Sequence, residues 1–329
     1  SVAASKVPQK TCTVAFRFIV FSPLLSGYRG SKYRRKRALA HARMRLRSGE
    51  RVAYALDSHV AIAAMLAKCL PGGFAMRRID FAAGFALVLA SIATALAAAE
   101  LPLERISLPP GFTIELWARV DNARQMTLGR HDDRGGTLFV GSMHAGKVHA
   151  LSYGADYRVR GVSVVASGLQ RPVGVAYRQG SLYVSAVNRI LRYDDIERRL
   201  ADPPAAALVT DRLPGETHHG WKFIAFGPDG KLYVPVGAPC NICEPDPQRY
   251  ANILRMAADG SAMELVASGV RNSVGFDWQP QTGELWFTDN GRDLLGDDLP
   301  ADELNHAPRA GMNFGYPYCH GGGRRHDLQ

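Results

Sequence analysis

The chain contains Gly136-Thr-Leu-Phe-Val140 and three further copies of this pattern, Gly180-Ser-Leu-Tyr-Val184, Gly230-Lys-Leu-Tyr-Val234 and Gly283-Glu-Leu-Trp-Phe287. Successive glycines lie 44, 50 and 53 residues apart. In each copy the glycine ends a tight turn, and the next four residues alternate between the two faces of a strand. The pattern therefore predicts one strand in each of four structural repeats.

The spacing of the copies indicates the size of the repeat. About 45–50 residues make one four-stranded blade, and such a sheet cannot bury both faces alone, so blades pack around an axis as a β-propeller. Three copies lead into a second strand-like stretch, at Lys147–Leu151, Arg189–Tyr193 and Asn252–Met256. We therefore expect an all-β propeller; the alternative is a large β-sandwich whose repeats are similar by chance. A closed ring needs more than four blades of this size, so we expect a chain truncated at its C-terminal end.

The composition of the chain is that of a globular protein. It has 329 residues, of which 47% are hydrophobic and 21% charged, and this excludes a disordered, collagen-like or coiled-coil chain. The net charge is +10, but residues 1–75 hold 14 Lys and Arg against two acids, and the remainder holds 26 against 28. Because the expected propeller is nearly neutral, the charge does not predict a nucleic-acid partner.

Residues 76–99 have the parts of a secretory signal peptide. A positive start, Met76-Arg-Arg, precedes the uncharged stretch Phe81–Ala99, which closes in three alanines. We therefore expect three parts: an upstream basic segment at 1–75, non-native, disordered or helical and outside the mature protein; a signal peptide at 76–99; and a partial propeller at 100–329. This predicts a periplasmic or secreted protein with no stable membrane span after cleavage. The alternative is a single membrane anchor with a basic cytoplasmic arm, since 19 apolar residues can cross about 30 Å of hydrocarbon.

Three polar stretches are candidates for the site. They are Glu216-Thr-His-His-Gly-Trp221, Gly269-Val-Arg-Asn-Ser-Val-Gly-Phe276, and Thr288-Asp-Asn-Gly-Arg-Asp293 with its acidic continuation to Asn305. Equivalent loops of a propeller converge on one end of its axis, so these stretches are expected to meet. Histidine can serve as a general base, arginine can stabilise an anionic oxygen, and an acidic loop with exposed carbonyls can hold Ca²⁺. The alternatives are a structural histidine and a solvated acidic turn.

The same stretches resemble the glucose/sorbosone dehydrogenase family, and the L-sorbosone dehydrogenase branch most closely. The resemblance rests on His218–Val234, on Gly269-Val-Arg-Asn with Gly275-Phe, and on Asp289-Asn-Gly-Arg followed by Asp302-Glu-Leu-Asn305 and Gly311–Pro317. It implies a six-bladed propeller of which about four blades are present. It also implies pyrroloquinoline quinone (PQQ), Ca²⁺ and the oxidation of an aldose or related aldehyde.

The resemblance assigns roles to individual residues. His219 matches the catalytic base, and Arg271 with Asn272 matches the pair at the cofactor, where Arg271 would stabilise negative charge on the quinone. The carbonyls of Gly291 and Arg292 match the backbone pair that binds Ca²⁺, although the family often has Gly-Pro there. On the substrate side we expect His218, Asp302 and Gln170, the last from an alignment that can slide by one residue. Further family contacts to the quinone lie downstream of Gln329.

Cys240-Asn-Ile-Cys243 allows three interpretations. Covalent haem needs a histidine directly after the second cysteine, and Glu244 stands there instead. A zinc site would need Cys319 and His320 to complete its four ligands. In an exported protein a local Cys240–Cys243 disulfide is the leading interpretation.

Two other functions remain open from the sequence. A Ca²⁺-dependent sugar lactonase also uses a six-bladed propeller, but it holds its metal with carboxylate side chains on the axis and needs no quinone. A ligand-binding propeller without catalysis is the other. For the dehydrogenase, the expected partners are a sugar substrate and a separate electron acceptor, a cytochrome or a quinone, because the chain has no haem motif.

Overall fold

The computed structural model describes residues 15–21, 101–321 and 324–325. The chain forms two compact units, one made of Ser1–Tyr33 and Leu108–Gln329 and the other of Arg34–Ser107. In the second unit only residues 101–107 are described, and they contain the short 3-10 helix η1 (Leu103–Arg105). The expected signal peptide at 76–99 lies outside the described residues, as does most of 1–75, so these assignments stay predictions.

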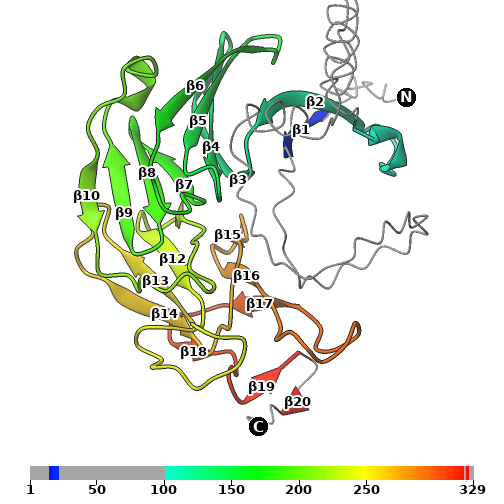
Figure 1. Cartoon of the computed structure of the whole chain (residues 1–329), viewed down its shortest axis with the longest axis vertical. Helices are drawn as coiled ribbons and strands as arrows, with labels where there is room; N and C mark the ends of the chain where they lie inside the picture. The colour runs from blue at the N-terminus through cyan, green and yellow to red at the C-terminus, as the bar shows by residue number, and fades with distance from the viewer. Residues whose placement is uncertain (1–14, 22–100, 322–323, 326–329) are drawn as a thin grey trace, which may run out of the picture. The chain divides into compact units, whose positions relative to one another are not determined.

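The first unit is built from four antiparallel sheets that follow one another along the chain, here blades 1 to 4 (Figure 1). Blade 1 holds β3 (Ala123–Asp132), β4 (Gly135–Ser142), β5 (Val148–Gly154) and β6 (Val159–Ala166). Blade 2 holds β7 (Val175–Arg178), β8 (Ser181–Ala186), β9 (Arg189–Tyr193) and β10 (Ala207–Thr210), with the 3-10 helix η2 (Ile196–Arg198) between the last two. Blade 3 holds β11 (Ala225–Phe226), β12 (Leu232–Val236), β13 (Asn252–Met256) and β14 (Glu264–Ser268). Blade 4 holds β15 (Phe276–Trp278), β16 (Leu285–Asp289) and β17 (Glu303–Ala307).

The repeat predicted from the sequence is confirmed. Its four copies lead into or lie within β4, β8, β12 and β16, each the second strand of its blade, and the strand-like stretches after them become β5, β9 and β13. The described part of the chain is therefore an all-β, propeller-like arrangement of about four blades. One local expectation was wrong: the acidic stretch does not stay a loop to Asn305, because β17 begins at Glu303 and pairs with β16.

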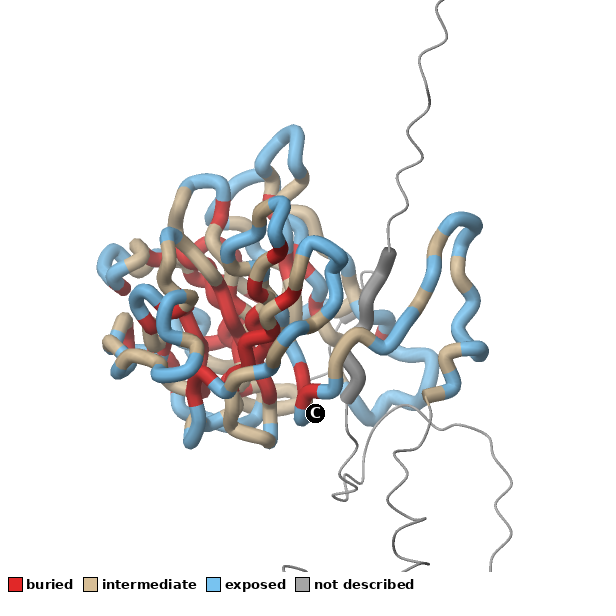
Figure 2. The backbone as a smooth tube through the Cα atoms, turned by 90° about the horizontal axis from the view of Figure 1, so that it is seen from above, coloured by how far each residue is buried: buried red, intermediate tan, exposed pale blue. Residues whose placement is uncertain are grey.

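The Gly-x-Leu-aromatic pattern follows from burial on both faces of a blade. In β8, Leu182 and Val184 pack into the core shared with blade 1, whereas Tyr183 packs into the core shared with blade 3. In β12, Leu232 and Val234 likewise face blade 2, and Tyr233 faces blade 4. Alternate residues of a strand point to opposite faces, so one short motif supplies both interfaces. Figure 2 shows the resulting buried interior in red.

A single glutamine of β3 joins three blades at their inner strands. Gln125 donates from Nε2 to the carbonyls of Val175 (2.9 Å) and Ile224 (2.7 Å). Its Oε1 accepts from the backbone N–H groups of the same two residues, at 3.2 and 3.1 Å. The side chain thus replaces the strand neighbour that the inner edges of blades 2 and 3 lack at this point.

Smaller sheets lie outside the blades. β1 (Ala15–Phe21) pairs in parallel with β2 (Thr113–Val120), and β19 (Cys319–His320) pairs with β20 (Arg324–Arg325). β18 (Met312–Asn313) instead extends the blade 3 sheet, where it pairs in parallel with β14. Within the described residues, no helix is long and apolar enough to cross a membrane.

Candidate functional site

The three polar stretches meet where loops enter and leave the inner strands of blades 3 and 4. The imidazole of His219 contacts the carbonyl of Ala238, and the amide of Ala238 donates to the carbonyl of Arg271 at 2.8 Å. The guanidinium of Arg271 reaches the carbonyl of Gly291 at 2.8 Å, and the amide of Gly291 donates to Asp302 Oδ1 at 2.9 Å. A continuous series of hydrogen bonds therefore joins residues that lie up to 83 positions apart in the sequence.

His219 is held in one tautomer by the backbone. Nδ1 lies 2.8 Å from the carbonyl oxygen of Ala238, which can only accept, so Nδ1 carries the proton and Nε2 keeps its lone pair. Among the described residues, none forms a hydrogen bond with Nε2. The residue adopts a left-handed backbone conformation (φ 47°), and a side chain at Gly237 would meet its Cβ at 2.6 Å. A glycine at position 237 therefore leaves room for the ring beside β12.

The environment of His219 keeps its imidazole neutral. Burial lowers its pKa to about 4, and the positive charge of Arg271 adds to this shift. Both causes disfavour the protonated ring. The side chain is half-buried, so Nε2 is a neutral proton acceptor at physiological pH.

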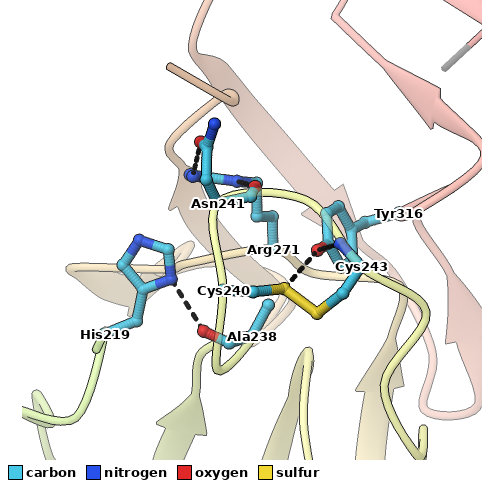
Figure 3. Close-up of a disulfide and its surroundings, with 7 residues drawn as sticks. All are labelled: His219, Ala238, Cys240, Asn241, Cys243, Arg271 and Tyr316. Atoms are coloured by element: carbon cyan, nitrogen blue, oxygen red, sulfur yellow. Dashed lines mark hydrogen bonds between the residues drawn. A yellow bond between two sulfur atoms is a disulfide. The ribbon is translucent and has the colours of Figure 1, made fainter. Parts of the chain in front are cut away.

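Arg271 is almost completely buried, and its hydrogen-bond acceptors are neutral oxygen atoms. Figure 3 shows its contact with Asn241. Nε donates to the carbonyl of Asn241 (2.8 Å) and Nη2 to its Oδ1 (2.8 Å), whereas Nη1 donates to the carbonyls of Asn290 (2.9 Å) and Gly291 (2.8 Å). The Asp293 carboxylate lies 3.7 Å from Nη2 and is largely exposed. The guanidinium charge is therefore held mainly by dipoles and is only weakly neutralised.

Asp289, the last residue of β16, fixes the backbone of the Arg271-Asn272 pair. Its two carboxylate oxygens accept the amide protons of Arg271 (2.9 Å) and Asn272 (2.7 Å). Burial raises the pKa of Asp289 to about 7, although these two hydrogen bonds oppose the shift. Asn272 is itself buried, and its Oδ1 lies 3.0 Å from the position of a Cβ on Gly237. The expected pair thus lies beside His219.

The remaining candidate residues are more exposed than Arg271 and Asn272. His218 is exposed, with its ring centroid 4.1 Å from that of His219. Asp302 is exposed and holds the Gly291 amide, and Arg292 is half-buried in the same loop. Gln170 is exposed, and in the described part of the chain its side chain forms no hydrogen bond with another candidate. Its neighbour Arg171 donates to the carbonyl of Thr217, in the His219 loop.

The cysteine motif forms a disulfide. Cys240 and Cys243 are bonded, with their Cα atoms 6.1 Å apart, and Cys319 is free and exposed. Between residues 101 and 321, no group of three or more His, Cys, Asp or Glu side chains is arranged to hold a metal ion. The structure therefore contradicts the zinc alternative, because two of its four ligands are joined to each other.

Three contributors were not singled out from the sequence. Asn241 binds Arg271 and Asp289 binds the backbone of the pair, as described above. Lys222 is buried, donates from Nζ to the carbonyl of Gly220 (2.7 Å), and has its pKa lowered to about 8 by burial. A lysine two residues after Gly220, between two hydrophobic residues, was the only available indication.

Comparisons with known proteins bear on the family of the chain and on its fold. Residues 185–326 match the family model described as Glucose / Sorbosone dehydrogenase. That range contains every candidate residue except Gln170. The match supports, for this part of the chain, the family indicated by the sequence motifs.

Two curated proteins are related in sequence. An uncharacterized protein of Borreliella burgdorferi is 32% identical over 234 residues, which are 68% of this chain and 59% of that protein. A protein of Hypocrea jecorina described as a pyrroloquinoline quinone-dependent sugar dehydrogenase is 25% identical over 188 residues, 48% of this chain and 43% of that protein. The chain thus spans about half the length of the curated relatives it matches.

A solved structure shares the fold. The PQQ domain of pyranose dehydrogenase from Coprinopsis cinerea superposes with a TM-score of 0.50 at 18% identity, over 61% of this chain and 57% of that domain. This likeness supports the propeller arrangement of the described blades.

Proposed function

We propose that this chain is part of a quinoprotein of the glucose/sorbosone dehydrogenase family that oxidises a sugar with PQQ as electron acceptor. One observation carries the proposal: the His219 ring is fixed through Nδ1 by Ala238, has no described partner at Nε2, and lies in the field of a buried arginine. The family match over residues 185–326 and the description of the Hypocrea jecorina relative support it.

The chain's own residues would handle the proton. His219 Nε2 accepts the proton of the sugar hydroxyl, while the Ala238 carbonyl holds the tautomer and steadies the imidazolium that forms. When bound, the quinone supplies the two-electron acceptor for the hydride from the same carbon. Arg271 provides fixed positive charge beside the site, and an anionic oxygen would be stabilised there.

The positive charge of Arg271 makes the site suitable for an anionic cofactor. Arg271 lowers the pKa of His219, so its positive charge acts at the imidazole, and its acceptors are mainly neutral carbonyls. The cavity between Arg271, Asp289 and Tyr316 measures only about 10 Å³, room for roughly one water molecule. A quinone would therefore not fit this cavity, and His219, Arg271 and Asn272 are the residues that would hold it.

The expected calcium ligands fit less well in this arrangement. The carbonyl of Gly291 already accepts from the Arg271 guanidinium at 2.8 Å, which places a positive charge against the oxygen that would hold the cation. Calcium at Gly291 and Arg292 therefore stays a prediction, and no step of the proposed chemistry passes through it.

The finer features of the proposal follow the sequence resemblance. The substrate would be an aldose or a sorbosone-type sugar, with His218, Asp302 and Gln170 on its side of the site. Electrons would leave to a separate acceptor, a cytochrome or a quinone. The signal-like segment at 76–99 favours export to the periplasm or medium.

The test is a reconstitution. The full-length gene product would be purified, supplied with PQQ and Ca²⁺, and assayed for dye reduction with a panel of sugars. Quinone-dependent reduction that His219→Gln abolishes supports the proposal. Hydrolysis of sugar lactones without quinone would instead indicate a lactonase, and inactivity in both assays would leave a ligand-binding propeller.

A further inference from the structure

We infer that Asn241, held in the Cys240–Cys243 loop, is a positioning residue that orients the guanidinium of Arg271 and fixes the loop at residues 290–293. The inference deepens the proposed function and rests on it for the role of Arg271. Nothing in the sequence motifs or in the comparisons assigns a role to Asn241.

Asn241 makes four hydrogen bonds to two segments that are far away in the sequence. Its carbonyl accepts from Arg271 Nε and its Oδ1 from Arg271 Nη2, both at 2.8 Å. Oδ1 also accepts the amide proton of Asp293 (2.8 Å), and Nδ2 donates to the carbonyl of Asp293 (3.1 Å). Three of the four bonds involve the amide side chain, so a substitution can remove them separately from the backbone contact.

The two ends of the amide have different partners, and this fixes its orientation. Oδ1 faces two donors, the guanidinium and the Asp293 N–H, whereas Nδ2 faces an acceptor. A reversed amide would place N–H groups against donors and an oxygen against a carbonyl. Only an asparagine or a similar amide satisfies both sides.

The disulfide gives Asn241 a fixed position. Cys240 and Cys243 close a four-residue loop around it, and the Tyr316 hydroxyl contacts both ends, at 3.1 Å from the Cys243 amide and 3.5 Å from Cys240 Sγ (Figure 3). A cross-link over so short a loop restricts the chain locally and adds little through loop-closure entropy. We therefore assign it the local function of holding Asn241 against Arg271.

The segment that leads into this loop also contacts His219, the proposed general base. Ala238, two residues before Cys240, accepts from His219 Nδ1 and donates its amide to the Arg271 carbonyl. Consequently one short segment, 238–243, sets the relative position of the imidazole and the guanidinium. Loss of the Asn241 side chain would remove the hydrogen bonds to Arg271 Nη2 and to the Asp293 backbone while leaving the Ala238 contacts unchanged.

The experiment compares Asn241→Ala with Asn241→Asp in the full-length protein. The alanine removes all three side-chain bonds, whereas the aspartate keeps an oxygen for Arg271 and the Asp293 amide. Gln279→Ala is the matched control, because the Gln279 amide oxygen accepts from two backbone amides, Gln281 (2.8 Å) and Thr282 (2.6 Å), in the distant β15–β16 turn. The Cys240→Ser/Cys243→Ser double variant tests the disulfide.

Two readouts are measured. Hydrogen exchange of the Asp293 amide, in the absence of quinone and sugar, should quicken about fivefold or more in Asn241→Ala, because this amide donates to Asn241 Oδ1. The kcat for sugar oxidation should fall on the order of 10- to 100-fold, because the lost bond is to a charged group, with a smaller effect on the sugar KM. Asn241→Asp should keep the Asp293 amide slow to exchange but should not restore the kcat, because its carboxylate would neutralise the guanidinium. The double serine variant should resemble Asn241→Ala in both readouts.

The outcomes separate this inference from the proposed function. Unchanged exchange of the Asp293 amide in Asn241→Ala overturns the inference, as does a wild-type kcat in that variant. A wild-type protein without quinone-dependent activity refutes the proposed function, and the exchange data then still decide whether Asn241 holds the loop. Gln279→Ala should leave both readouts at the wild-type level.

Discussion

Replacing Gln125 by methionine tests whether a single side chain joins the inner strands of three blades. Methionine keeps the length and volume of the side chain but makes none of the four hydrogen bonds to Val175 and Ile224. Both residues are fully buried, so their N–H groups would be left without a partner. At about 1–3 kcal/mol for each buried unsatisfied group, the variant should lose about 2–6 kcal/mol of unfolding free energy.

Calorimetry and urea titration of the purified protein would measure this loss. For a domain of this size it corresponds to a fall in Tm of roughly 5–20 °C. Thr127→Val is the control, because Thr127 lies two residues further on the same strand and face, whereas the four hydrogen bonds of the junction belong to Gln125. This variant should shift Tm by no more than about 2 °C. A Gln125→Met protein within about 1 kcal/mol of the wild type would refute the idea that Gln125 bridges the blades.

Three further predictions concern titrating groups. Burial and Arg271 lower the pKa of His219 to about 4, so the rate of sugar oxidation should stay constant on the acid side until the pH falls to about 4. A rate that already falls at about pH 6.5 would contradict this. His219→Gln should lower kcat about 10²–10⁴-fold. Burial lowers the pKa of Lys222 from 10.5 to about 8, so the unfolded protein binds more protons than the folded protein between these pH values. The unfolding free energy of the wild type should therefore rise by about 3 kcal/mol from pH 8 to 10.5 relative to that of Lys222→Met. Parallel plots of unfolding free energy against pH for the two proteins would exclude the effect. His149 is buried, its Nδ1 has no hydrogen-bond partner and burial lowers its pKa; stability should therefore fall as pH drops below about 6.5, and His149→Leu, followed by urea titration at each pH, should remove that loss.

The repeat strands could be predicted because their sequences show which residues are buried. Leu182, Tyr183 and Val184 alternate between two cores, and the same alternation recurs in β4 and β12 at blade spacing. In β16, Leu285 and Phe287 enter one core and Trp286 between them is exposed. β17 was missed because its residues, Glu-Leu-Asn-His-Ala, pack on one side only: Ala307 is buried, whereas Leu304 is 68% exposed. A strand with one covered face and polar residues resembles a loop in sequence.

The individual site residues were recognisable only where a motif marked them. His219, Arg271 and Gly291 lie in stretches too polar for blade cores, so their convergence could be expected from the repeat. Asp289 lies in one of these stretches, but its role could not be predicted, because it depends on a contact across 18 positions of sequence. Asn241 lies outside them, and its contact with Arg271 spans 30 positions. No local pattern distinguishes an asparagine that binds a buried guanidinium from one in a solvated turn.

The hydrogen-bond partners of Arg271 explain how the site can bury the positive charge of the guanidinium without neutralising it. A close carboxylate at the guanidinium would neutralise it, and the positive field at His219 would weaken. Here the nearest buried carboxylate, Asp289, binds the backbone of residue 271 instead, and burial raises its pKa to about 7, which reduces its own charge. Carbonyl dipoles satisfy the guanidinium, so the desolvation cost of burying it is partly offset while its charge still acts at the imidazole. That arrangement is the physical reason for expecting an anionic ligand, and not a second cation, beside His219.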